Sequence, residues 1–282
     1  MALDLEAAQA AIAAVTGALG LSVDEAAWGI HQIVNENMAN AARVHAVERG
    51  LDPRRLPLFA FGGAGPVHAL GVAAALGSPT VYAPPGAGVM SAAGFLTAPL
   101  AFDFVRTRRA LLDRTDWAEV ETLFAEMEHA GEELLGLDEV THRRIADLRY
   151  VGQGHELRVE VPPGGAAELR AAFERRYREL YGHEGPAVSV EALNWRVVSS
   201  GPAPAVGLWT HVPAHAHTRT SPSERDVFFP GGRRAVPVYD RYALEPGARL
   251  DGPAIVEERE STLVVPPGRA AEVTEQLAVV VR

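Results

Sequence analysis

The chain has 282 residues, 48% of them apolar and 22% charged, which is typical of a globular protein with one large domain or two ordinary ones. Its 36 acidic and 26 basic side chains give a formal net charge of −10, so we expect no nucleic-acid partner. The absence of cysteine excludes disulfides, thiolate zinc sites and a cysteine nucleophile. No stretch reaches the roughly 18 apolar residues that span a bilayer, so we expect a cytoplasmic protein without membrane contact.

Two helices are predicted at the start of the chain, over residues 5–17 and 22–49. The second opens with a capping box, Ser22 with Glu25, and closes at Gly50. Apolar residues at helical spacing predict its buried face: Ala26, Ile30, Ile33, Val34, Met38, Ala41, Ala42 and Val44. Asparagines at 35, 37 and 40 interrupt its polar side.

A strand, helix and strand follow, joined by a glycine-rich turn. Residues 58–61 are short and continuously apolar, which predicts a strand buried on both faces. Residues 62–65, which we call the first glycine turn, precede a small-residue helix over 67–76 and a strand over 80–83. Free backbone amides at that helix start favour an anion or a polar ring. A tight turn without a ligand needs the same glycines, so the spacing alone leaves both interpretations open.

The rest of the chain changes character. A third helix is predicted from Trp117 to Leu134, capped by Asp116 and Glu119. Strands over 145–151 and 156–161 form a predicted hairpin, a helix over 166–181 follows, and strands and turns dominate beyond residue 188. The proline-rich stretch 201–230 predicts an exposed loop.

Two blocks of the sequence resemble a known protein family. FGGAGPVH, residues 61–68, and PPGAGVMSAAG, residues 84–94, resemble the hydantoinase A/5-oxoprolinase/acetone carboxylase beta-subunit family. We call residues 84–94 the second glycine turn. Further blocks resemble the same family in order, over residues 29–43, 47–50, 149–157, 181–183, 194–196, 238–241 and 252–257. The resemblance therefore spans nearly the whole chain.

This resemblance implies a fold and an arrangement of domains. The family looks like two-lobed ATPases of the actin, hexokinase and Hsp70 type, whose first lobe opens with an Asp-x-Gly phosphate loop that we do not find here. We therefore expect the last two fifths of a longer subunit, as a piece of it or as the product of a split gene. Residues 1–107 would be an α/β second lobe, and residues 108–282 an α+β, strand-rich C-terminal domain.

The resemblance also implies a function. Family members use ATP with Mg²⁺ to phosphorylate an unreactive amide or enolate oxygen, so this chain would contribute the adenosine side of a nucleotide site for cyclic amide hydrolysis. The phosphate and magnesium site would lie in the missing N-terminal lobe, and a hydantoinase B-type subunit would be the partner. Hydantoin, 5-oxoproline and a ketone for carboxylation remain open as substrates. The implied contacts to the cofactor are Gly62, Gly63, Ala64, Gly65, His68, Asn37 and Arg43.

Several interpretations remain open beside this one. In one alternative, the chain is a non-catalytic assembly module that docks the partner subunit. In that case His68 is an ordinary hydrogen-bonded histidine. Asn37 and Arg43, and with them Asn35, would then belong to a solvated helix face, and the second glycine turn would be structural.

Other polar clusters have weaker claims. The spacing of His211, His215 and His217, in a proline-rich stretch without nearby carboxylates, does not favour a metal site. One polar cluster, expected either to contact a partner or to satisfy strand-end hydrogen bonds, consists of Tyr150, Gln153, His155 and Glu156. A later polar group consists of Tyr181, His183 and Glu184. We assign no metal ligand and no catalytic residue, because the sequence has no Gly-x-Ser-x-Gly elbow, P-loop or paired metal-binding carboxylates.

Overall fold

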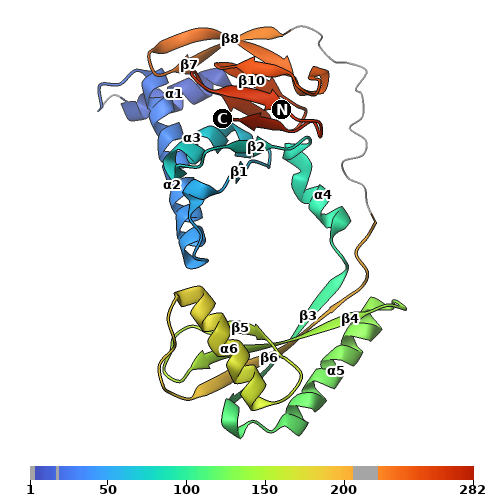
Figure 1. Cartoon of the computed structure of the whole chain (residues 1–282). Coiled ribbons are helices and arrows are strands. Elements are labelled where there is room, and N and C mark those ends of the chain that lie inside the picture. Colours follow the sequence, from blue (N-terminus) through green and yellow to red (C-terminus); the bar gives the residue numbers. More distant parts are fainter. Residues whose placement is uncertain (1–3, 17–18, 206–221) are drawn as a thin grey trace. The chain divides into compact units, whose positions relative to one another are not determined.

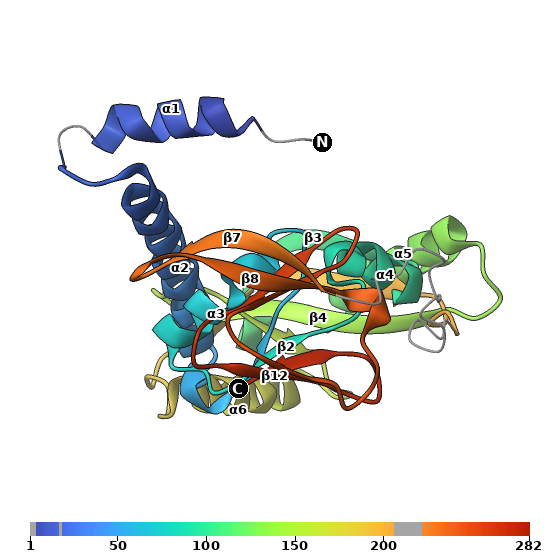
Figure 2. The ribbon, with the colours of Figure 1, turned by 90° about the horizontal axis from the view of Figure 1, so that it is seen from above.

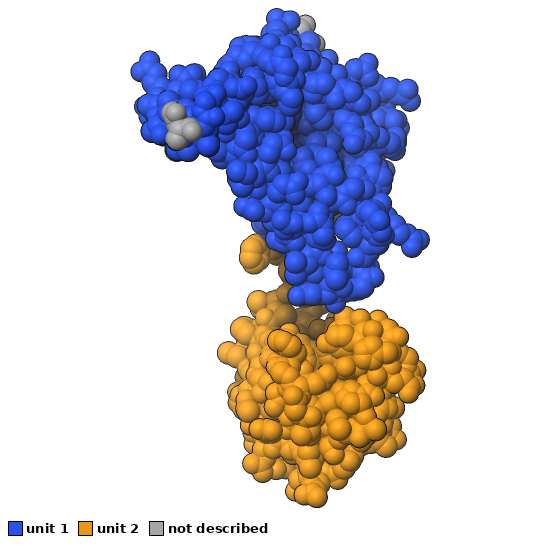
Figure 3. Space-filling view, turned by 90° about the vertical axis from the view of Figure 1, so that its left-hand side faces the viewer, with its two compact units in different colours: residues 1–94, 207–282 blue, residues 95–206 orange. Residues whose placement is uncertain are grey.

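The computed structural model describes residues 4–16, 19–205 and 222–282. The chain forms two compact units, one from residues 1–94 together with 207–282 and the other from residues 95–206 (Figure 3). The division expected after residue 107 does not coincide with these units. The reason is that the end of the chain returns to its beginning: β13 (Val279–Val281) pairs with β2 (Val81–Ala83) in one sheet.

The first sheet of unit 1 has the order β1-β2-β13-β12-β9 (Figure 1). β1 (Leu58–Phe59) and β2 are parallel and are joined by α3 (Gly65–Leu76), which confirms the predicted strand, helix and strand. β12 (Ala270–Val273) and β9 (Arg249–Asp251) complete the sheet. Small residues let α3 lie close to it, because Ala69 and Ala73 are buried in the core that the sheet shares with α3.

One expectation for this sheet is wrong. Residues 58–61 do not form a strand buried on both faces, since Phe59 and Phe61 are 48% and 49% exposed. Alternate residues of a strand point to opposite faces, and α3 covers only the face of Leu58 and Ala60. On the other face the ring of Phe59 therefore contacts those of Phe61 and Tyr82.

A second sheet of unit 1 has the order β11-β10-β8-β7, with β7 and β8 as a long hairpin (Figure 2). Its strands are β7 (Ser223–Phe229), β8 (Gly232–Asp240), β10 (Ala254–Glu257) and β11 (Thr262–Val265). β7 lies inside the stretch expected to be a loop, so that expectation is wrong for its residues. Burial of Phe229 with Val236, Val238 and Ile255 explains why this segment is a strand.

Two helices open unit 1, α1 (Leu5–Thr16) and α2 (Val23–Glu48), and the predicted capping box of Ser22 and Glu25 is confirmed. The predicted buried face of α2 is confirmed for Ala26, which is buried, and is wrong for the long apolar side chains. Ile33 is 63% exposed, and Ile30, Val34, Met38 and Val44 are also exposed. Instead α2 packs on α3 through its smaller side chains, and Ala39 is buried with Val72 and Leu76. Close contact between two helices selected small residues here rather than the long apolar ones.

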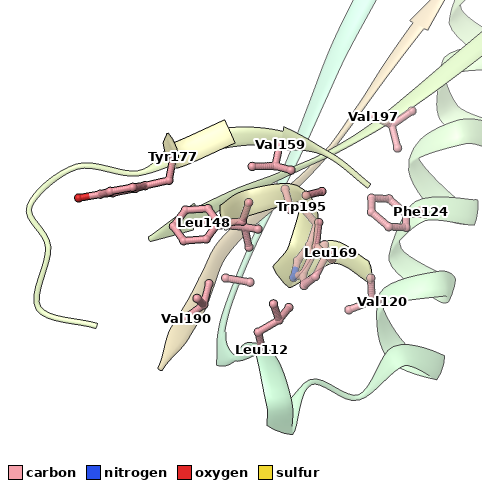
Figure 4. Close-up of a cluster of buried hydrophobic side chains, with 14 of the residues drawn as sticks. Leu112, Val120, Phe124, Leu148, Val159, Leu169, Tyr177, Val190, Trp195 and Val197 are labelled. Carbon is pink, nitrogen blue, oxygen red and sulfur yellow. The ribbon is translucent and has the colours of Figure 1, made fainter. Parts of the chain in front are cut away.

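Unit 2 is an antiparallel sheet of order β3-β6-β4-β5. Its elements are β3 (Ala101–Leu111), α5 (Trp117–Leu135), β4 (Thr141–Tyr150), β5 (Leu157–Glu160), α6 (Ala166–Tyr181) and β6 (Val190–Ser200), and α4 (Met90–Thr97) precedes them. Side chains of α5, α6 and the sheet form one core around Trp195 (Figure 4). The predicted hairpin and the helix over 166–181 are confirmed. Asp116 caps α5 as expected, whereas Glu119 pairs with Arg108.

Charged side chains hold the opposite face of the unit 2 sheet. The buried carboxylate of Asp147 accepts hydrogen bonds from Arg196 Nε at 2.9 Å and Asn194 Nδ2 at 2.8 Å. Glu191, also buried, accepts from Arg109 and Arg149, each at 2.8 Å. Burial raises the pKa of Glu191, but the two guanidinium groups outweigh the effect of burial, and the net pKa is lowered.

None of the helices formed by the described residues combines the length and the apolar character needed to cross a bilayer.

Candidate functional site

The first glycine turn connects β1 to the start of α3. Gly62 has a φ of 89°, which favours glycine, and its N–H donates to the carbonyl of Ala87 at 2.7 Å. Within the described part of the chain, the N–H groups of Gly63, Ala64 and Gly65 have no hydrogen-bond partner. Because α3 adds its own positive end, the turn presents donors to a polar or negatively charged group.

Space around the turn is uneven. A Cβ at Gly65 would meet no atom within 4 Å, whereas one at Gly63 would lie 3.4 Å from the carbonyl oxygen of Glu260. The amides of residues 63–65 are therefore supported on the side of Glu260 and open at Gly65. This arrangement suits a ligand that approaches the backbone closely.

The second glycine turn lies against the first. Its Ala87 carbonyl accepts the Gly62 N–H, and the Gly86 N–H donates to Glu258 Oε2 at 3.1 Å. A Cβ at Gly88 would lie only 2.4 Å from the Glu260 carbonyl oxygen. The structural role left open for this turn is thus visible, since its glycines allow a close backbone contact.

A buried arginine, Arg241, lies beside the start of the second glycine turn. Arg241 Nη2 donates to the carbonyls of Ala83, at 3.1 Å, and Leu277, at 2.8 Å. Burial lowers the pKa of this guanidinium, and the negative charge of Glu258 acts in the opposite direction. Arg241 therefore joins the end of β2 to the loop before β13.

His68 lies one turn into α3 and is held from α2. Its Nδ1 is 2.8 Å from Asn35 Oδ1, within hydrogen-bond distance. The ring stacks on His31 with centroids 4.6 Å apart. Burial and then the neighbouring His68 lower the pKa of His31. Asn35 is 1% exposed, and its Nδ2 has no hydrogen-bond partner among the described residues.

The structure does not bring Arg43 or Asn37 to the first glycine turn. Arg43 Nη2 donates to the carbonyl of Ala75, at the opposite end of α3 and about 15 Å along that helix from Gly65. Asn37 is exposed and lies about 200° around α2 from Asn35. His31, which the sequence reasoning missed, occupies the position beside His68 instead.

A cleft of about 800 Å³ runs between α2, α3 and β7. Trp28, Phe228 and Phe229 give it aromatic walls. Its charged lining residues are Asp24, Glu36, Asp226 and Arg233, and Arg233 is paired with both aspartates. This negative balance disfavours a polyphosphate in the cleft.

Of the remaining candidates, Gln153 has local hydrogen-bond partners, His155 and Glu156 are exposed, and three histidines fall outside the described residues. Gln153 accepts from the Tyr150 N–H at 3.2 Å and donates to the Tyr177 hydroxyl at 3.3 Å, as expected for strand-end hydrogen bonding. His211, His215 and His217 lie outside the described residues. In the described ranges no group of three or more His, Asp or Glu is placed to hold a metal ion.

Comparison with known proteins decides the family. The model of the hydantoinase/oxoprolinase family matches residues 1–104, and that of the hydantoinase/oxoprolinase C-terminal domain matches residues 109–277. The chain belongs to the hydantoinase/oxoprolinase family. The resemblance drawn from residues 61–68 and 84–94 is thereby confirmed.

Three similar proteins illustrate the likeness. An uncharacterised protein of Methanocaldococcus jannaschii is 34% identical over 270 residues, which is 94% of this chain and 39% of that protein. The structure of an ATP-dependent caprolactamase from Pseudomonas jessenii matches with a TM-score of 0.70 and 28% identity, over 97% of this chain and 42% of that one. A nucleotide-free structure of acetone carboxylase matches with a TM-score of 0.63 and 25% identity, over 99% and 43%. The chain thus has the hydantoinase family fold and spans about two fifths of the relatives' length.

Proposed function

We propose that this chain contributes the adenosine side of a nucleotide site that serves ATP-driven hydrolysis of a cyclic amide. The supporting observation is the row of unpaired N–H groups at Gly63, Ala64 and Gly65, at the start of α3. Membership of the family and likeness to a caprolactamase described as ATP-dependent support the choice of ATP and of an amide.

Within this proposal the backbone of residues 62–65 contacts the adenosine. His68 is fixed by Asn35 and stacks on His31, so we assign it to the packing of α2 on α3 beside the site. We do not include Arg43 or Asn37 in the proposed site. Arg43 binds the far end of α3, and Asn37 is exposed.

The rest of the catalytic apparatus is proposed to lie elsewhere in the assembly. Unit 1 is proposed to be the second lobe of an actin-type ATPase fold, and Mg²⁺ and the β- and γ-phosphates to be bound by residues that precede this chain in longer relatives. Phosphorylation of the amide oxygen would convert it into a leaving group. A B-type subunit would complete the enzyme, in the cytoplasm, and this chain alone would not turn over substrate.

A second candidate is an assembly module without a ligand of its own. The exposed apolar side chains of α2, such as Ile33 and Val47, and the exposed rings of Phe59 and Phe61 favour it. Under this alternative the glycines serve packing alone, and a partner subunit covers the apolar surface.

The experiment that separates the two is calorimetric titration of ATP and ADP, with magnesium, into the chain combined with a separately supplied N-terminal lobe. We expect saturable binding that Gly63→Val abolishes while assembly survives. Gly154→Val is the matched control, because a Cβ there meets no atom within 4 Å and the residue lies in unit 2. Assembly without nucleotide binding in the unchanged protein would favour the module.

A further inference from the structure

A turn from the far end of the sequence supports both glycine turns. Residues 258–261 connect β10 to β11, about 170 positions after the second glycine turn. The carbonyl of Glu260 would be 3.4 Å from a Cβ at Gly63 and 2.4 Å from one at Gly88. The β10–β11 turn therefore lies directly against the backbone of each glycine turn.

Glu258 makes the polar contacts of this turn. Its Oε2 accepts the Gly86 N–H at 3.1 Å, and its Oε1 accepts the Ser261 hydroxyl at 2.5 Å. Each carboxylate oxygen thus has a different partner, and Ser261 fixes the orientation of the group. Hydrogen bonds to a charged acceptor are roughly twice as strong as those between neutral groups.

The hydrogen bonds continue from the second glycine turn to the first. Gly86 is held by Glu258, and the next residue, Ala87, accepts the Gly62 N–H at 2.7 Å. Gly62 in turn precedes the three amides without partners. Hydrogen bonds of Ser261, Glu258, Gly86 and Ala87 therefore link the β10–β11 turn to the residues whose N–H groups have no partner in the described part of the chain.

We infer that Glu258 is a positioning residue for the nucleotide site: it fixes the second glycine turn, which orients the amides of residues 63–65. This inference rests on the proposed function. Donors held in place before the ligand arrives cost less ordering on binding, so the loss of Glu258 weakens binding without touching the ligand.

The test measures ATP affinity from amide shifts of the ¹⁵N-labelled chain combined with the unlabelled N-terminal lobe, a method that detects millimolar binding. We expect Glu258→Ala to weaken ATP binding about tenfold, the effect of losing one charged hydrogen bond. Glu258→Gln keeps an oxygen for the Gly86 N–H and should restore affinity to within about threefold. Glu257→Ala is the matched control, since that neighbouring carboxylate pairs with Arg225 on the surface.

The outcomes separate this inference from the proposed function. Unchanged ATP affinity in folded Glu258→Ala would overturn the positioning role and leave the nucleotide site standing. No shift at residues 62–65 in the unchanged chain combined with the N-terminal lobe would overturn both. If Glu258→Ala does not fold, Ser261→Ala replaces it, with an expected loss of about threefold. A purely structural role would lower the stability of the variants but not the ATP affinity of the folded protein.

Discussion

At the scale of single residues, the packing of α2 on α3 depends on one asparagine and one glycine. Asn35 reaches His68 with its Oδ1, and its Nδ2 lies against the backbone of Gly71. A Cβ at Gly71 would be 2.8 Å from Asn35 Cγ, closer than real Cβ contacts allow. The absence of a side chain at Gly71 therefore leaves room for Asn35 between α2 and α3, which explains a glycine in the middle of α3.

Gly71→Ala is expected to destabilise the protein, although alanine is the better helix former. The overpacking against Asn35 costs about 1–3 kcal/mol and exceeds the roughly 0.5–1 kcal/mol that alanine gains in a helix interior. Gly29→Ala in α2 is the matched control: a Cβ there meets no atom within 4 Å, so this change should stabilise. Urea denaturation of the three proteins measures both effects, and equal stabilisation by the two alanines would contradict the packing described.

At the scale of elements, the unit 2 sheet has an apolar face under two helices and a charged face on the other side. Asp147 and Glu191 are buried on that second face because arginines of neighbouring strands cover them. Burial of a carboxylate is tolerated only with such pairing, and removal of its charge leaves a cation without its main partner. Register of the strands therefore matters for charge as well as for hydrophobic contact.

Asp147→Asn should lower the free energy of unfolding by about 3 kcal/mol, because Arg196 loses a buried anionic partner. Asp103→Asn provides the comparison, since Asp103 binds the same arginine at 3.3 Å but its side chain is 46% exposed, against 1% for Asp147. An exposed pair contributes at most about 1 kcal/mol. Similar losses in the two variants, measured by chemical denaturation, would show that burial does not control this pair.

Elements with local signals were predictable from the sequence. The capping box of α2, the Asp116 cap of α5 and the hairpin of β4 and β5 depend on residues a few positions apart, and all are confirmed. The burial of Asn35 on α2 was not predictable, because the space for its side chain is left by Gly71, which lies outside that helix. β7 was missed because its partner strand and core, not its composition, make it a strand.

At the scale of the whole molecule, unit 1 is discontinuous in sequence and unit 2 is inserted into it. Each unit has its own core, around Trp195 in unit 2 and around Val81 and Val279 in the first sheet of unit 1. The strands β9, β12 and β13 come from the end of the chain, so the first 94 residues lack most of their own sheet. A linear division of the sequence could not reveal this insertion.

The insertion predicts different behaviour of two fragments. Residues 95–206, expressed alone, should fold, because all four strands and both helices of their core are present. Residues 1–94 alone should not, because β1 and β2 would lack β13. Circular dichroism and thermal unfolding measure the outcome; a cooperative transition in the shorter N-terminal fragment, or none in residues 95–206, would contradict this division.

The candidate site was predictable only in part, for the same reason. Residues 62–65 form a local pattern of strand, turn and helix, so the sequence located the turn. Glu258, Ser261 and Arg241 support it from more than 150 residues away, and their contacts depend on the return of the chain. Arg43 was assigned to the site from its helix alone, without knowledge of which end of α3 it meets.

The central claim is that adenosine binds the backbone of the first glycine turn. The most direct measurement is the response of the amide signals of Gly62, Gly63, Ala64 and Gly65 when ATP, AMP or inorganic triphosphate is titrated into the ¹⁵N-labelled chain combined with the N-terminal lobe. We predict shifts at these four residues that saturate at lower concentrations of ATP and AMP than of triphosphate, because only the nucleotides carry adenosine. Shifts with triphosphate alone, or no shifts at this turn with any of the three, would contradict an adenosine site here.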